Sequence, residues 1–179
     1  PLRRASSGTR ASPPLDLSPV GTAAGSAISW NASIPGVVLG GSGIYSGRIA
    51  WSEDTNFPDP KPSYLPADKF SWMVEGQIII PADGTYAFGL DSDDASDLFI
   101  DDQLVVSWYG GHSTAGSGGV PDFNLHNGAI ALTAGLHTIR VRIVEGTGNS
   151  GIAVGWKKPG DASFSIIPAE QFENLQYKW

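Results

Sequence analysis

The chain has 179 residues, with 11 basic and 18 acidic side chains, a formal net charge of −7 and no cysteine. The missing cysteines exclude disulfides, iron–sulfur sites and thiol catalysis, and the negative charge argues against a nucleic-acid partner, which would favour a basic surface. With 41% hydrophobic residues the chain can form one globular core, yet no apolar stretch approaches the roughly 20 residues of a membrane span.

Residues 1–27 differ in composition from the rest, because 19 of the 27 are Ala, Ser, Pro, Gly or Thr. Such a segment is typical of a linker and cannot bury enough apolar surface to become ordered alone. It holds three basic residues and one acidic residue, which leaves residues 28–179 with eight basic and 17 acidic residues, a formal charge of −9. We predict an extended arm at 1–27 and a folded domain at 28–179. No apolar region follows the first four residues, so we expect no intact signal peptide there.

From residue 28 onward the hydrophobic pattern has a period of two, which predicts strands rather than helices. The expected strands are 70–78, 85–90, 97–108, 129–133, 136–144 and 151–157. Within 136–144, Ile139, Val141 and Ile143 share one face, which predicts that they point into a core. The segments 52–69 and 108–127 are too long for simple hairpin turns, so we expect binding or packing loops there. The fold class predicted is an all-β antiparallel sandwich.

One segment is unusually acidic, because seven of the 18 acids lie between Asp83 and Asp102 with no Lys or Arg among them. Its sequence from residue 84 to 101, GTYAFGLDSDDASDLFID, resembles the central motif of PA14 domains. Supporting pieces lie at 70–81 before it and at 104–108, 134–141 and 154–156 after it. The resemblance covers roughly residues 44–175 and is densest from 70 to 156.

This resemblance implies a jelly-roll-type β-sandwich that serves as an extracellular, non-catalytic module, secreted or on the cell surface. Many PA14 domains bind carbohydrate, so the expected partners are glycans or cell-surface polysaccharide. In the lectin branch, two consecutive aspartates joined by a cis peptide bind one Ca²⁺, which in turn binds sugar hydroxyls. Asp93 and Asp94 match that pair. A second loop then corresponds to 146–151, where Asn149 offers a side-chain oxygen and Ser150 or Gly151 a backbone carbonyl.

Other acidic residues of the segment have two interpretations. Asp91 and Asp97 either complete the metal shell or are solvated carboxylates at strand ends, and we favour the second. Asp101 and Asp102 are expected to form the turn between two strands. Glycoside hydrolysis requires two carboxylates across a cleft. We do not expect it here, because nothing in the sequence places Asp93 with Asp94, or Glu75 with Glu145, in that arrangement. No HExxH or GxSxG motif is present, so we expect no enzyme.

Aromatic residues and histidines supply candidates for sugar contacts. Trp72, Trp108 and Trp156 are expected in the core. If they are exposed, Trp51, Trp108 or Tyr109 would stack on a sugar face. His112 and His126 lie in the 108–127 loop, where they would make polar contacts to a glycan. One sequon, at Asn31, is a candidate for N-glycosylation in a secreted protein.

A second role stays open beside the lectin interpretation. The arm at 1–27 and the acidic body have opposite charge, which suggests the protomer of an extracellular fibre. In such a fibre the arm would pack on the neighbouring subunit or donate a strand to it, forming a homo-oligomer or filament, and Ca²⁺ would act as a structural brace. Alternatively, the arm would pack on the folded domain of its own chain or be held by attached glycans.

Overall fold

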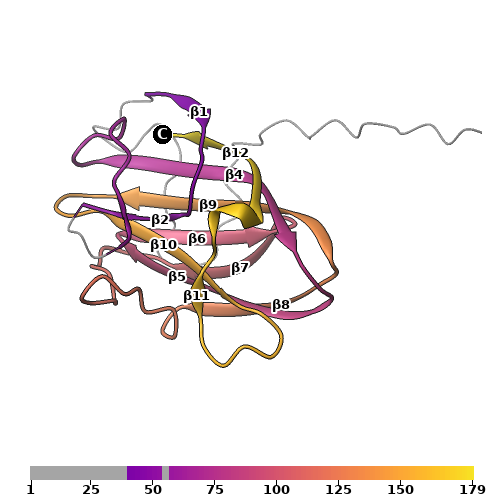
Figure 1. Cartoon of the computed structure of the whole chain (residues 1–179). Helices are drawn as coiled ribbons and strands as arrows, with labels where there is room; N and C mark the ends of the chain where they lie inside the picture. Colours follow the sequence, from indigo (N-terminus) through magenta and orange to yellow (C-terminus); the bar gives the residue numbers. More distant parts are fainter. Residues whose placement is uncertain (1–39, 54–56) are drawn as a thin grey trace, which may run out of the picture.

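Two stacked β-sheets form the molecule in the computed structural model (Figure 1), which describes residues 40–53 and 57–179. The first sheet has the strand order β1-β12-β4-β9-β6-β7, and the second has the order β3-β2-β10-β5-β8, with β11 paired to β10. The predicted arm at 1–27 and the sequon at Asn31 lie outside the described residues. The all-β sandwich predicted from the sequence is confirmed.

The strands are bounded as follows: β1 Ser42–Ile44, β2 Ala50–Ser52, β3 Asp59–Pro60, β4 Phe70–Ile80, β5 Gly84–Asp93, β6 Ala95–Ile100, β7 Gln103–Trp108, β8 Asn127–Leu132, β9 Gly135–Glu145, β10 Gly151–Lys157, β11 Ser165–Ile166 and β12 Phe172–Lys178. A short 3-10 helix, η1 (Ala169–Gln171), precedes β12. All pairings among these strands are antiparallel except that of β2 with β3, which is parallel. In the described part of the chain, no helix has the length and apolar character that crossing a membrane requires.

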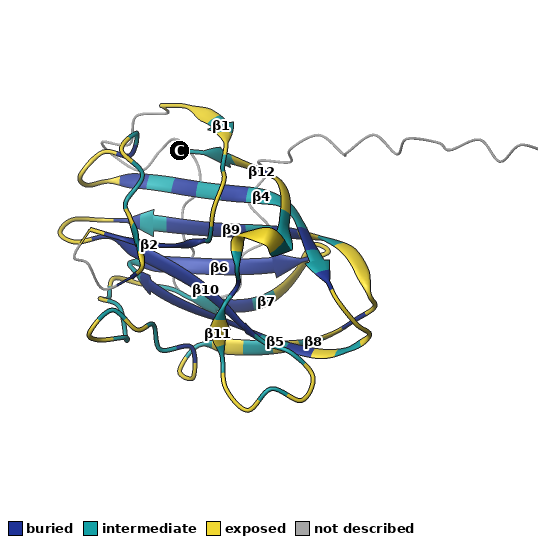
Figure 2. Cartoon of the chain, in the orientation of Figure 1, coloured by how far each residue is buried: buried dark blue, intermediate teal, exposed yellow. Residues whose placement is uncertain are grey.

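The core lies between the two sheets and follows the alternation of the strands. Ile139, Val141 and Ile143 are at most 1% exposed, as their shared face predicted. Figure 2 shows the buried residues concentrated on the central strands β6, β5 and β10, while the exposed residues gather on loops and at β1. Trp72 and Trp156 are buried as expected. Trp51 does not have the exposed ring that sugar stacking would require, because its ring packs edge-on against Trp72 in the core.

The sandwich is closed along one side, where β7 and β8 approach each other from different sheets. A side-chain carbon at Gly128 of β8 would overlap the carbonyl oxygen of Val105 on β7, so this position requires glycine. Residues 109–126 connect β7 to β8. The contact between these two strands therefore also fixes the two ends of that long loop.

Candidate metal site and the loops around it

Three connections between the two sheets meet at one end of the sandwich. β5 of the second sheet runs directly into β6 of the first at Asp93 and Asp94. Residues 146–150 join β9 to β10, and residues 109–126 join β7 to β8, each again passing between the sheets. The pairing of Gly151 with Asp93 and of Trp108 with Ser96 brings these connections to the same end.

Asp93, Asp94 and Glu145 form a group of three carboxylates at this end, with one oxygen of each within 4.8 Å of the others. The peptide bond between Asp93 and Asp94 is cis, which agrees with the geometry that the family resemblance implies. Both aspartates are half-buried, whereas Glu145 is only 1% exposed. Carboxylate oxygens are the ligands that Ca²⁺ prefers, so the donor set fits a divalent hard cation.

Backbone amides from the 109–126 and 146–150 connections hold Asp94. Its Oδ1 accepts a hydrogen bond from the His112 N–H at 2.9 Å, and its Oδ2 accepts one from the Gly146 N–H, also at 2.9 Å. The 146–150 loop is tied down further, because the Gly148 N–H donates to Asp68 and the Ser150 hydroxyl donates to Glu53. These donors orient the carboxylate without supplying a full positive charge.

Glu145 is buried with only weak compensation, because the charge of Lys61, which acts on it, is paired with Glu53. Neither of its carboxylate oxygens has a hydrogen-bond partner of good geometry, although the nearby Asp94 N–H slightly favours the charged form. Burial first, and then the charges of Asp94 and Asp93, raise the pKa of Glu145 to about 8. Burial and the neighbouring carboxylates therefore favour the protonated form of Glu145 when no cation balances their charge.

Asp91 and Asp97 do not belong to this carboxylate group, and the prediction that they are solvated is wrong, since both side chains are fully buried. Asp91 accepts three backbone hydrogen bonds of 2.8 Å, from the N–H groups of Ala115, Gly116 and Asp122. Burial raises its pKa, and the three amides partly offset that rise. Asp97 forms a two-point ion pair with Arg142, with N···O distances of 2.8 and 2.6 Å. Alternation alone could not show these partners, because they come from distant segments.

Trp108 lies between two imidazole rings. The His112 ring stacks on it at 3.5 Å between centroids and 4° between planes, and the His126 ring at 3.9 Å and 11°. The two imidazole rings must lie on opposite faces of the indole, because two rings this close to the same centroid would overlap on one face. Trp108 therefore has no free face on which a sugar could stack. Nδ1 of His112 is buried, and its Nε2 lies 3.4 Å from the Trp108 carbonyl oxygen. Tyr109 donates its hydroxyl to Asp97.

The residues predicted in the second loop lie in different surroundings. Gly151 pairs directly with Asp93, so its backbone is next to the carboxylate group. Ser150 is buried with its hydroxyl bonded to Glu53, and Asn149 is exposed in the loop. Glu145 was not predicted as a ligand. Its position in β9 continues the alternation of Ile139, Val141 and Ile143, so the sequence already indicated that its side chain faces inward.

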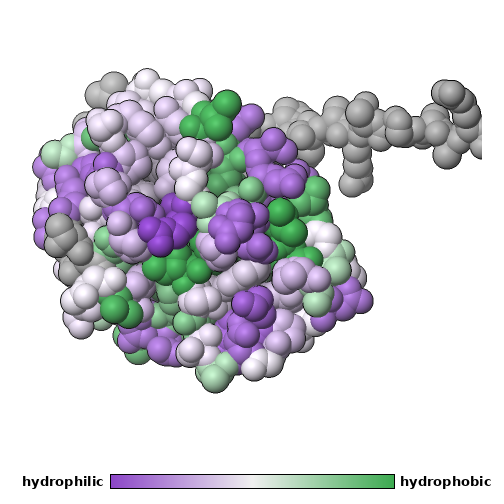
Figure 3. All heavy atoms as spheres, viewed as in Figure 1, coloured by the Kyte–Doolittle hydropathy of each residue, from purple (hydrophilic) through white to green (hydrophobic). Residues whose placement is uncertain are grey.

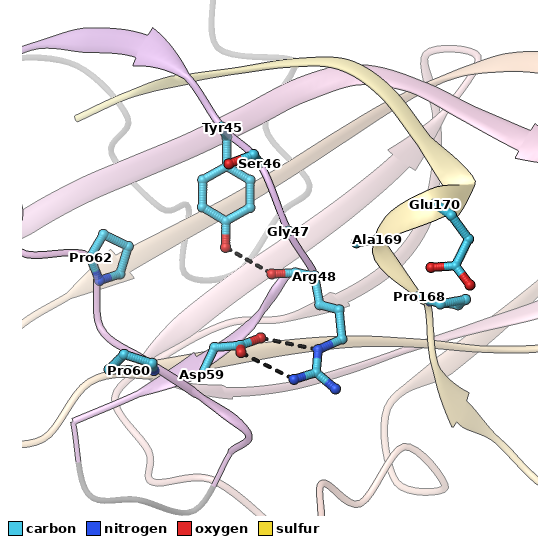
Figure 4. A pocket seen from close by; sticks show the side chains of 10 residues that line it. All are labelled: Tyr45, Ser46, Gly47, Arg48, Asp59, Pro60, Pro62, Pro168, Ala169 and Glu170. Carbon is cyan, nitrogen blue, oxygen red and sulfur yellow. Dashed lines mark hydrogen bonds and ion pairs between the residues drawn. The ribbon is translucent and has the colours of Figure 1, made fainter.

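A separate groove of about 560 Å³ lies near β1, β3 and η1 (Figure 4). Three of its polar residues bind one another: Arg48 forms a two-point ion pair with Asp59, and the Tyr45 hydroxyl donates to the Arg48 carbonyl. On the face seen in Figure 3, hydrophobic residues form small areas between hydrophilic ones. Neither feature includes the carboxylate group.

Comparison with protein families identifies the fold: a model of the PA14 domain matches residues 48–170. The chain belongs to the PA14 domain family. Among curated protein sequences none matches significantly.

Several solved structures share the PA14 fold. The PA14 sugar-binding domain from an RTX adhesin is 14% identical with a TM-score of 0.53, covering 74% of this chain and 78% of that one. The epithelial adhesin 9 A domain from Candida glabrata, in complex with Galβ1-3GlcNAc, is 13% identical with a TM-score of 0.53, covering 74% and 68%. An anti-sigma factor domain-containing protein from Clostridium clariflavum is 22% identical with a TM-score of 0.55, covering 70% of this chain and 39% of that one. This PA14 domain thus spans well under half of that larger protein.

Proposed function

We propose that this PA14 domain is a non-catalytic, extracellular carbohydrate-binding or adhesion module that depends on Ca²⁺ held by Asp93 and Asp94. The observation that carries the proposal is the meeting of both aspartates with Glu145 at the end of the sandwich where the long loops converge. Bound Ca²⁺ has six to eight oxygen ligands, so it supplies positions that sugar hydroxyls can fill. The sugar complexes and sugar-binding domain among the structural neighbours support a glycan as the ligand class.

The residues of the chain would share the work of holding the ion and the sugar. Asp93 and Asp94 supply carboxylate oxygens, and the Gly151 and Asn149 region is the source of further oxygens from the second loop. His126 would offer a ring nitrogen to sugar hydroxyls beside Trp108, whereas Nδ1 of His112 is buried and its Nε2 lies 3.4 Å from the Trp108 carbonyl oxygen. Val120 and Leu125, which are 67% and 65% exposed on the same long loop, would contact the apolar C–H face of a pyranose.

A hydrolytic role for Glu75 and Glu145 has no geometric support. Glu145 pairs with Phe70 at the start of β4, and Glu75 lies five residues further along that strand. Five strand residues span roughly 17 Å, compared with the separation of about 5–10 Å between the carboxyl groups of glycosidases. The fibre role stays a prediction, because the arm that it needs lies outside the described residues.

Thermal unfolding with Ca²⁺ and with a chelator tests the metal. At a Ca²⁺ concentration 100 times the dissociation constant, the domain should gain about 2.7 kcal/mol of stability. Asn replacement of both Asp93 and Asp94 should abolish the gain, whereas the matched double variant D101N/D102N should keep it. An unchanged melting curve for the wild-type chain would overturn the metal assignment.

A glycan array probed in Ca²⁺ and in chelator tests the ligand class, with the β-galactosyl-N-acetylglucosamine disaccharides as the first probes. We expect binding that chelator removes and that D93N/D94N lacks. A calcium-dependent melting shift with no glycan bound anywhere on the array would overturn the carbohydrate proposal and leave the metal site standing.

A further inference from the structure

We propose that Glu145 is a third carboxylate ligand of the cation at Asp93 and Asp94, an assignment that rests on the calcium site proposed above. With Glu145 included, the chain itself supplies three negative charges to the ion, so the ion binds tightly before any glycan arrives. The role inferred from the resemblance involves only the aspartate pair and the 146–151 loop. Glu145 is outside both.

The position of Glu145 is fixed by strand pairing rather than by a loop. It is the last residue of β9, opposite Phe70 on β4 and one residue beyond the Val144 pair with Ala95 of β6. Because Ala95 directly follows Asp94, the pairing of β9 with β6 places the glutamate beside the aspartate pair. A side chain on paired strands has little freedom to turn away from the other two carboxylates.

The burial of Glu145 points to a ligand. Its side chain faces inward at 1% exposure, both carboxylate oxygens lack hydrogen-bond partners, and one oxygen is within 4.8 Å of oxygens from both aspartates. Buried carboxylates are normally hydrogen-bonded, paired with a cation or bound to metal. Among the residues that the structure describes, Glu145 and Asp94 take part in no ion pair, and the nearest arginine on β9, Arg142, is bound to Asp97. A divalent ion satisfies all three carboxylates at once.

A buried glutamic acid with its own proton is the competing explanation, and it makes different predictions. In that case Glu145 would be a packing residue, and an amide of the same shape would serve equally well. If Glu145 is a ligand, the amide removes a charge and a strong donor from the ion. A shorter carboxylate would then also fail, because the backbone of β9 cannot move to compensate.

Isothermal titration of the full chain with Ca²⁺ distinguishes these cases. We expect E145Q to weaken Ca²⁺ binding by about 10-fold or more, since affinity at such sites follows the number of charged ligands. E145D should also weaken binding, because its carboxylate is one methylene short. The matched control is E75Q, a glutamate of the same sheet that faces Arg140 rather than the site, and it should leave the affinity unchanged within about 2-fold.

Each outcome decides between the two proposals. Wild-type affinity in E145Q, together with loss of binding in D94N, would overturn the role of Glu145 and keep the calcium site. Loss in E145Q with wild-type affinity in E145D would show that charge alone acts and would also overturn ligation. A wild-type chain that binds no Ca²⁺ would overturn both proposals. Melting of the ion-free E145Q protein shows that it is folded, and we expect it to be at least as stable as wild type.

Discussion

Two identical dipeptides stand at the two ends of β6, and their surroundings differ. Asp93 and Asp94 precede the strand, and Asp101 and Asp102 follow it. At the first end, Asp94 is held by backbone N–H groups from two loops. At the second end, basic side chains of β9 pair with the carboxylates: His137 contacts Asp101 at 2.6 Å, and Arg140 contacts Asp102 at 3.2 Å.

The two kinds of partner leave different net charges. Amide dipoles orient a carboxylate but cancel no whole charge, so the first end keeps an excess of negative charge that a dissolved cation can neutralise. Basic side chains cancel the charge at the second end, where Asp101 and Asp102 have positive φ angles of 48° and 61° and form the predicted turn. The two Asp-Asp dipeptides that flank one strand thus differ in their partners, since backbone amides hold Asp94 whereas basic side chains pair with Asp101 and Asp102.

Removing a basic partner where the carboxylate is buried should have the largest effect. Asp97 lies on β6 between the two dipeptides, and its charge is balanced by Arg142. In R142M an uncompensated charge remains in the core, so we expect a loss of about 3–5 kcal/mol in the free energy of unfolding. Urea denaturation measures it.

R140M is the matched control for R142M on the same strand, because its partner Asp102 is 84% exposed. Exposed ion pairs contribute about 0–1 kcal/mol, so R140M should lie within that range. Equal losses of unfolding free energy in R142M and R140M would mean that the buried ion pair of Asp97 contributes no more than the exposed one of Asp102.

An intermediate effect is expected at Asp91, two residues before the first dipeptide. In D91N the amide nitrogen faces donors where an oxygen stood, so the 115–122 part of the loop should lose about 2 kcal/mol of local stability. Hydrogen exchange of the amides of Ala115, Gly116 and Asp122 reports this directly.

D122N is the control in the same loop. Asp122 uses one oxygen to accept from Asn124, and asparagine retains such an acceptor. Exchange at Ala115 and Gly116 should stay unchanged in D122N. Protection lost equally in both variants would mean that Asp91 does not hold the loop.

The smallest effect concerns pH at the second dipeptide. Burial lowers the pKa of His137, but its bonds to Asp101 and to the Thr133 carbonyl outweigh this and raise the pKa overall. Both ring nitrogens face acceptors, so the bound form is the imidazolium. Burial raises the pKa of Asp101, and the bonds from His137 and Thr138 outweigh this and lower it.

The raised pKa of His137 and the lowered pKa of Asp101 determine how stability depends on pH. The contribution of His137 is complete below its unfolded pKa of about 6.5 and is lost as pH rises through the higher folded value. That of Asp101 is complete above about 3.9 and is lost as pH falls through the lower folded value. We expect the stability difference between wild type and H137N to be largest between these limits and no more than about 1 kcal/mol. A difference that grows above pH 7 would contradict the assignment.

The sequence predicted the strands whose alternation was regular and the one motif whose residues are contiguous. Ile139, Val141 and Ile143 were placed correctly because one buried face imposes a period of two. The strands β1, β2, β3, β11 and β12 were not predicted. The first four have only two or three residues, too few for a periodic signal, and the burial of β12 does not alternate regularly. β12 also has a bulge at Asn174, which interrupts its alternation.

The candidate site could be predicted only where its residues are neighbours in sequence. Asp93 and Asp94 are adjacent and carry a family pattern, whereas Glu145 reaches them through two strand pairings. Trp51 and Asp97 were misjudged for a related reason. Whether an aromatic ring or a carboxylate is buried depends on partners such as Trp72 and Arg142, and those lie 21 and 45 residues away.

The convergence of three sheet connections also orders the events of folding. The bonds that shape the site join Asp94 to residues 18 and 52 positions away and Asp91 to one 31 positions away. Contacts so distant in sequence form late, because the intervening chain must first be closed into loops. A nascent chain that has reached residue 140 already contains both aspartates but lacks the last turn of the site. The hydrogen bonds that hold Asp94 and Asp91 are therefore complete only when the whole sandwich is assembled.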